Sequence, residues 1–169
     1  MSYLRTLGLF AYLLFAVPSP VKAQFLWAEI GVDGLTCSAC SRSVEMSLRK
    51  LSFVDSVDMN LEHTQGKIFF KKNGIVDADK IAQAVVDAGF SVRFLRADFS
   101  FTSIPENAQF TFENTKYQLI KTADKKINKE TILTFIGKNF LSKKEFSHWK
   151  NELKNFPVSK KEKTYFVTL

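Results

Sequence analysis

The two cysteines of this 169-residue chain stand three positions apart, as Cys37 and Cys40. A disulfide between residues so close in sequence would constrain the unfolded chain very little, so a purely structural role is disfavoured. Thiolates are soft ligands that select monovalent copper and other thiophilic ions over magnesium or calcium. The same pair could instead cycle between dithiol and disulfide, which an oxidising compartment would favour. The spacing therefore indicates either soft-metal binding or redox chemistry.

The residues around the cysteines predict a strand before them and a helix after them. Apolar and polar residues alternate from Leu26 to Asp33, and Gly34 ends that run. From Ser38 the apolar period changes to three and four residues, which is typical of an amphipathic helix. The cysteines straddle the predicted helix start, where free N–H groups and the positive end of the helix dipole stabilise thiolate.

The chain after this helix predicts four further elements. Two strands, at residues 57–61 and 67–72, form a hairpin closed by a polar turn. Asp77 is the expected N-cap of a second helix, and Gly89 its left-handed C-terminal residue. Alternation from Phe90 to Phe94 predicts the last strand. This order predicts an α+β fold, a ferredoxin-like βαββαβ sandwich with both helices on one face of an antiparallel sheet.

Residues 34–40 read Gly-Leu-Thr-Cys-Ser-Ala-Cys between the first predicted strand and helix. This segment resembles the Gly-Met-Thr-Cys-x-x-Cys loop of the heavy-metal-associated (HMA) family, which includes copper chaperones, domains of copper-transporting ATPases and exported mercury-binding proteins. The resemblance covers residues 25–95 and includes Asp87-Ala88-Gly89-Phe90, whereas the C-terminal region is not recognised. It implies that Cys37 and Cys40 are metal ligands, with Cu(I) expected first and Hg(II), Zn(II) or Cd(II) as alternatives.

The resemblance also implies roles for residues around the two ligands. Gly34 and Thr36 complete the motif, and Phe90 is expected to pack under the site. Leu35 takes the position usually held by Met and fills the core beneath the loop; this exchange conserves volume, so the packing should survive. Thr36 is similar to the copper and mercury members, since the zinc-type members place an acidic residue there.

Other candidate ligands are weaker, and no catalytic constellation is found. Asp33 would be a hard ligand, and Met59 alternates with core residues of its strand. His63 is expected in a solvated hairpin turn at the end of the domain opposite the cysteine loop. The second histidine, His148, has no partner ligand nearby in sequence. The protein is therefore not expected to be an enzyme.

The first 23 residues have the pattern of a removable secretory signal. Arg5 precedes an apolar run from Leu7 to Val17, and Val21-Lys22-Ala23 offers a small residue at a cleavage point. An uncleaved membrane anchor is the alternative, although the run is shorter than the ~20 residues that a spanning helix needs. The sequence therefore predicts an exported protein, periplasmic or secreted.

A change in charge predicts a second domain. Residues 24–99 carry 9 basic and 10 acidic residues, whereas residues 100–169 carry 13 lysines and 7 acidic residues. This shift predicts an HMA domain at 24–98 and a small β-rich domain at 99–169, with one helix capped by Ser142 and a loose similarity to a partly open OB-like barrel. The lysines are scattered, so a solvated face is favoured over nucleic-acid binding. Contact with membrane headgroups or an acidic protein surface is a weaker hypothesis.

Together these patterns predict an exported protein without catalysis that holds one Cu(I) between Cys37 and Cys40 for transfer or sequestration. A thiol–disulfide redox protein that uses the same cysteines, or an interaction module without metal, is the alternative. The expected partner is a metal-transporting ATPase or another metal-trafficking protein, and no nucleic acid.

Overall fold

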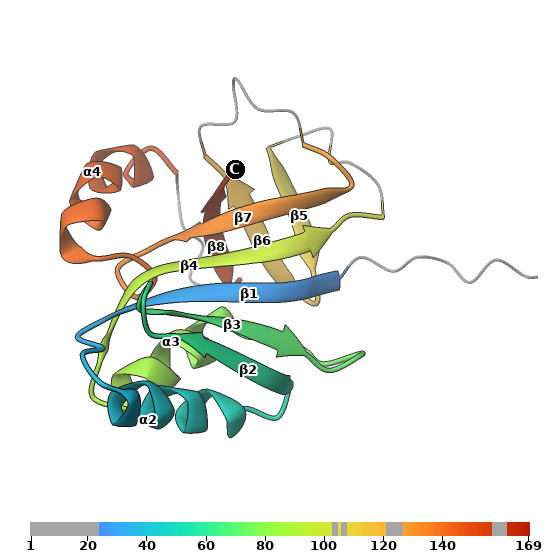
Figure 1. Cartoon of the computed structure of the whole chain (residues 1–169). Coiled ribbons are helices and arrows are strands. Elements are labelled where there is room, and N and C mark those ends of the chain that lie inside the picture. The colour runs from blue at the N-terminus through green and yellow to red at the C-terminus, as the bar shows by residue number, and fades with distance from the viewer. Residues whose placement is uncertain (1–23, 103–104, 106–107, 121–126, 157–161) are drawn as a thin grey trace, which may run out of the picture.

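The computed structural model describes residues 24–102, 105, 108–120, 127–156 and 162–169, so the predicted signal at residues 1–23 lies outside the described residues. The described residues form eight strands and three helices, shown in Figure 1. None of these helices is long and apolar enough to span a bilayer. In chain order the elements are β1 (Gln24–Asp33), α2 (Ser38–Arg49), β2 (Val54–Asn60), β3 (Gln65–Phe70), α3 (Ala78–Asp87), β4 (Ser91–Ser100), β5 (Gln109–Phe112), β6 (Thr115–Leu119), β7 (Glu130–Ile136), α4 (Lys143–Leu153) and β8 (Thr164–Thr168).

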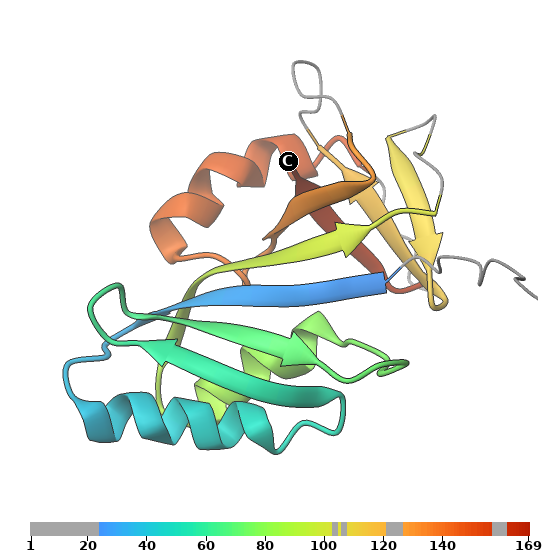
Figure 2. The same cartoon turned by 45° about the vertical axis from the view of Figure 1, so that its right-hand side comes forward.

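The elements from β1 to β4 form the predicted sandwich. β1 pairs antiparallel with both β3 and β4, and β2 pairs antiparallel with β3. Both α2 and α3 lie on the same side of these strands, as Figures 1 and 2 show. Their inward stripes, which include Val44, Leu48, Ile81 and Val85, are buried in the main hydrophobic cluster at the spacing that the sequence predicted. The α+β class and the ferredoxin-like arrangement are therefore confirmed.

The end of α3 fixes where the chain enters β4. Gly89 has a φ of +90°, and its N–H donates to the carbonyl oxygen of Val86 at 2.9 Å. The N–H of Phe90 donates to the carbonyl oxygen of Val85 at 3.1 Å, which completes a Schellman motif. The left-handed cap predicted at Gly89 is therefore confirmed, and it sets the position of Phe90.

The sheet continues past β4 into the second half of the chain. Its order is β2-β3-β1-β4-β7-β8-β6-β5, and β6 and β8 pair in parallel. The predicted boundary between residues 98 and 99 falls within β4, where Asp98 is registered with Trp27 of β1 and with Ile132 of β7. The β-rich region expected after the sandwich is present, and it joins the sandwich through β4, which pairs with β1 on one side and β7 on the other.

An aromatic cluster fills the interior between β1, β4 and the second half of the chain. Phe99 is 1% exposed, and its ring centroid lies 4.8 Å from that of Phe25 and 5.1 Å from those of Phe110 and Phe112. β5 is remote from β1 in the strand order, yet the ring centroids of Phe112 and Phe25 are 5.8 Å apart. The sheet therefore curls until its far edge approaches β1.

A smaller hydrophobic cluster forms beneath α4. Ser142 caps this helix as predicted, because its hydroxyl accepts from the N–H of Glu145 at 3.3 Å. The buried members of the cluster are Ile120, Ile136 and Leu141, and the partly buried Trp149 and Leu153 of α4 pack against them. In Figure 1, α4 lies across the β1 and β4 ribbons from α2 and α3.

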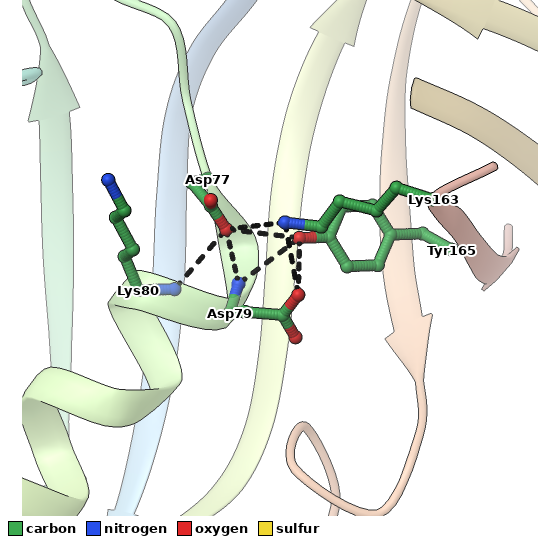
Figure 3. Close-up of polar contacts among 5 residues, drawn as sticks. All are labelled: Asp77, Asp79, Lys80, Lys163 and Tyr165. Atoms are coloured by element: carbon green, nitrogen blue, oxygen red, sulfur yellow. Dashed lines mark hydrogen bonds and ion pairs between the residues drawn. The ribbon is translucent and has the colours of Figure 1, made fainter. Parts of the chain in front are cut away.

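A polar network joins the start of α3 to β8, as Figure 3 shows. Asp77 is the predicted N-cap, and its carboxylate accepts from the N–H groups of Asp79 at 3.0 Å and Lys80 at 3.3 Å. The Lys163 ammonium lies 2.9 Å from Asp77 and 3.1 Å from Asp79. The Tyr165 hydroxyl lies 3.0 Å from the Asp79 carboxylate. The C-terminal strand thereby completes the cap of a helix in the sandwich.

Burial and charge act in opposite directions on these groups. Burial works to raise the pKa of Asp77, but hydrogen bonding and attraction from Lys163 outweigh it and leave that pKa below its ordinary value. Burial works to lower the pKa of Lys163, yet the two carboxylates raise it. Burial, followed by the charge of Asp79, raises the pKa of Tyr165. At neutral pH the network therefore holds an ion pair and a neutral tyrosine.

Candidate metal centre

The two cysteines lie at the N-terminal end of α2. Cys37 is the N-cap residue, with extended backbone angles of φ −149° and ψ 161°. Its Sγ accepts a hydrogen bond from the backbone N–H of Cys40 at 3.3 Å, so the sulfur points back over the first helical turn. Neither residue forms a disulfide; Cys37 is exposed, and Cys40 is half-buried against the main core. Solvent can therefore reach the pair from one side.

The surroundings of the pair favour thiolate. The pKa of Cys40 lies below the ordinary thiol value, first because of hydrogen bonding with the Cys37 side chain. Burial opposes this effect, and hydrogen bonds from the backbone and side chain of Thr36 reinforce it. The first turn of α2 contains no acidic residue that would offset the positive end of the helix. Deprotonation, which a metal-binding thiol requires, is therefore assisted.

The residues named beside the cysteines support the loop from below. Leu35 is 4% exposed and belongs to the main hydrophobic cluster, and the partly buried Phe90 packs against that cluster. Gly34 has a φ of +90°, a conformation that side chains with a Cβ rarely adopt. A Cβ added at Gly34 would lie 3.5 Å from the ring of Phe90, which is ordinary contact. Thr36 is exposed.

Gly34→Ala should therefore destabilise the fold because alanine is strained at a positive φ, and not because its methyl group clashes with Phe90. We expect a loss of about 1 kcal/mol in the free energy of unfolding, measured by urea denaturation. Gly89→Ala is the matched comparison, because Gly89 has the same φ of +90° and no heavy atom within 4 Å of the added Cβ. The two losses should be similar; a much larger loss at Gly34 would mean that Phe90 resists the new methyl group.

The position predicted for His63 is wrong. β1 and β2 are both antiparallel to β3, so they run in the same direction, and the turn after β2 reaches the end of the sheet where β1 enters the cysteine loop. The backbone confirms this, since the N–H of Val32 donates to the carbonyl oxygen of Thr64 at 2.9 Å. The exposed His63 thus lies at the same end of the sheet as the cysteines.

Arg93 also lies at this end of the sheet, and its role was not predicted from the sequence. Its guanidinium donates to the hydroxyl of Thr64 at 2.7 Å and to the carbonyl oxygen of His63 at 2.9 Å. It also lies 4.0 Å from the carboxylate of Asp33. Arg93 therefore holds the β2–β3 turn against β4, and no local pattern in the sequence signals this role.

The remaining candidate ligands do not gather around the cysteines. Within the described ranges, no group of three or more His, Cys, Asp and Glu residues could hold a metal ion. Met59 is partly buried and packs against the main core, as predicted. His148 is exposed on α4. The arrangement therefore offers two sulfur ligands, which suits a soft ion of low coordination number.

Comparisons with known proteins agree with this fold and this loop. A family model described as the heavy-metal-associated domain matches residues 29–91. The chain is 35% identical over 83 residues to the mercuric transport protein periplasmic component of Pseudomonas aeruginosa, across 48% of this chain and 90% of that protein. It is 31% identical over 64 residues to the copper chaperone CopZ of Staphylococcus haemolyticus, across 38% of this chain and 93% of that protein. The chain belongs to the heavy-metal-associated domain family.

A longer protein and a solved structure also match part of this chain. The chain is 34% identical over 92 residues to copper-transporting ATPase 1 of Rhizobium meliloti, but it spans only 11% of the length of that ATPase. Among solved structures, oxidised MerP of Ralstonia metallidurans is 32% identical, with 42% of this chain and 97% of that chain covered and a TM-score of 0.35. The family thus includes proteins named as a chaperone and as a periplasmic component as well as ATPases.

Proposed function

We propose that Cys37 and Cys40 bind one Cu(I) ion as cargo, and that the protein transfers or sequesters this ion without catalysing a reaction. The observation that carries the proposal is the placement of two free thiols at the N-terminal end of α2, joined by the hydrogen bond from the Cys40 N–H to Cys37 Sγ at 3.3 Å. Two thiolates satisfy a near-linear Cu(I) ion, and the lowered pKa of Cys40 assists their deprotonation.

The exposure of Cys37 suits transfer as well as binding. An incoming thiolate of a partner can bond to the ion while the bond to the exposed Cys37 breaks, so the ion need not be released into water. Cys40 packs against the core and would hold the ion during this exchange. Copper charge and oxidation state are unchanged throughout, so the step needs no external oxidant or reductant.

The relatives support copper and leave mercury as the second cargo. One matched relative is named a copper chaperone and another a component of mercuric transport. Thr36, before the first cysteine, supports the same two metals, and Zn(II) or Cd(II) follow from the softness of thiolate alone. The match to copper-transporting ATPases supports a partner of that class.

The proposed location is outside the cytoplasm. It rests on the signal-like pattern of residues 1–23 and is supported by the similarity to relatives named as periplasmic components. In such a compartment the cysteines must be kept reduced for the ion to bind, because a disulfide removes both thiolate ligands. A metal-trafficking system that includes this protein would therefore need a reductant for it.

Anaerobic titration of the reduced protein with Cu(I) against a chromophoric chelator tests the proposal. We expect one equivalent to bind the wild-type chain and none to bind Cys37→Ser/Cys40→Ser, because hydroxyls do not replace thiolates for a soft ion. Ser38→Ala/Ser43→Ala is the matched control, since it changes two exposed residues of the same helix and should retain full binding.

The same experiment separates metal binding from redox function. If the wild-type chain binds no Cu(I) but catalyses disulfide reduction through the same two cysteines, the proposal fails and the thiol–disulfide alternative replaces it. If neither property is found, the chain is an interaction module without metal. Folding of each variant is checked by circular dichroism, so that loss of binding is not confused with loss of structure.

A further inference from the structure

A groove separates α3 from the segment that joins β7 to α4. Its volume is about 470 Å³, and one wall is the outer side of α3 while the other is residues 138–143. Apolar side chains contribute to its lining, among them Val86, Val92 and Leu141. Val86 is 53% exposed, so its side chain is accessible to a bound molecule. The groove therefore offers an apolar contact surface.

Three lysines stand around this apolar surface. Lys80 comes from α3, while Lys138 and Lys143 come from the opposite wall, and all three are exposed. Within the described part of the chain, none of their ammonium groups forms an ion pair. Asp79, the acidic residue of the lining, is already paired with Lys163 at 3.1 Å. The groove therefore carries an uncompensated positive charge.

The groove lies at the end of the sheet that bears the cysteine loop. Its lining includes Ser91, which directly follows Phe90 and is registered with Asp33 at the end of β1. The opposite wall is anchored to the same region, because the N–H of Ser142 donates to the carbonyl oxygen of Arg93 at 3.0 Å. One end of the groove therefore lies at the edge where β1 enters the cysteine loop, and a protein larger than the groove can contact both.

We propose that this groove docks an acidic segment of a partner protein that exchanges metal with Cys37 and Cys40; the metal-exchange part rests on the function proposed above. Carboxylates of the segment would pair with the three lysines, and one apolar side chain would cover Val86. Lys138 and Lys143 lie outside residues 29–91, so the region that follows the heavy-metal-associated domain supplies one wall of the groove and two of its three lysines.

The shape of the site favours a peptide over a membrane. A bilayer surface is broad and flat, so it would reach the lysines around the groove but not the apolar residues between its walls. An extended acidic segment can enter a groove of this volume and contact both. The peptide and the membrane also differ in how they would bind. Only binding of the peptide should depend on an apolar side chain that enters the groove.

Fluorescence anisotropy tests the proposal with a labelled eight-residue peptide of Glu and Asp that has one central Leu. We expect saturable binding to the full metal-free chain. In Lys80→Glu/Lys138→Glu/Lys143→Glu the affinity should fall at least about tenfold, or about 1.4 kcal/mol, because the substituted carboxylates repel those of the peptide. Lys72→Glu/Lys129→Glu/Lys150→Glu is the control, because it makes the same change in net charge at exposed lysines outside the groove lining.

The outcomes decide between the groove and its alternatives. An equal loss in both triple variants, or no peptide binding to the wild-type chain, overturns the proposal. The groove would be a lipid site instead if the wild-type chain binds no peptide but cosediments with vesicles of phosphatidylcholine and phosphatidylglycerol. In that case the groove variant should lose cosedimentation and the control variant should keep it. Substitution of the central Leu of the peptide by Ser should lower its affinity for the wild-type chain, because the Leu side chain is expected to cover Val86.

Failure of docking can be distinguished from failure of the metal proposal. Peptide binding is measured without metal, and it should be unchanged in Cys37→Ser/Cys40→Ser. The groove variant, in turn, should still bind one equivalent of Cu(I), because none of its substitutions touches the cysteine loop.

Discussion

A chain that ends after Phe101 is expected to lose most of its stability. Truncation removes β7, which pairs along one edge of β4, and it removes the aromatic residues that cover Phe25 and Phe99. Exposure of two buried phenylalanines alone costs about 3–6 kcal/mol, against a typical domain stability of 5–15 kcal/mol. Urea denaturation followed by circular dichroism should show a weak or absent cooperative transition, and the exposed edge of β4 should promote association.

Polar substitution at the same two positions provides the control for this truncation. The truncated chain that carries Phe25→Thr/Phe99→Thr should be more soluble than the simple truncation, because threonine suits a strand and removes the exposed rings. The idea is wrong if the unsubstituted truncation unfolds cooperatively with the midpoint of the full chain. Because deletion of the second half is expected to disturb the first, substitutions in the groove test partner binding more cleanly than deletion does.

Local signals in the sequence account for the parts of the fold that were predicted correctly. Asp77 and Gly89 act on backbone groups within a few residues of themselves, so their caps could be inferred without tertiary structure. The same holds for Cys37 and Cys40. The spacing of apolar residues changes there from two to between three and four, which predicted a helix start at the cysteines. The metal-binding role of these cysteines is still a proposal.

Long-range contacts account for what was missed. Nothing local to Phe25 indicates that Phe112 will lie against it, because that contact depends on how the sheet curls. The guanidinium of Arg93 meets Thr64 only after β1 has brought their strands together. The error over His63 was different, since the predicted order of elements already required β1 and β2 to run in the same direction.

The change in charge near residue 98 does not by itself show that the chain divides into two separately folding domains. It coincides with the last residues of β4, where the chain leaves the sandwich for the aromatic cluster. The main hydrophobic cluster includes both Val44 of α2 and Val167 of β8. The division of the chain into two folding units is therefore still a prediction, and one substitution in the shared core can test it.

Phe99→Ala should destabilise the whole chain by about 3–5 kcal/mol, because it opens a cavity among rings that the surrounding strands cannot readily close. Ile132→Ala is the matched control: Ile132 lies on the neighbouring β7 but is 47% exposed, so its loss should cost less than about 0.5 kcal/mol. Denaturant unfolding of both variants measures these losses.

Hydrogen exchange then shows how far the loss at Phe99 spreads. If the chain unfolds as one unit, the amides of Val44 in α2 and Val85 in α3 should lose as much protection as those of β7 and β8. If protection falls only in β5 to β8, the two halves unfold separately, as the charge shift predicted. In the first case a partner bound to the C-terminal region would also stabilise the helix that begins at the cysteines, because both belong to one cooperative structure.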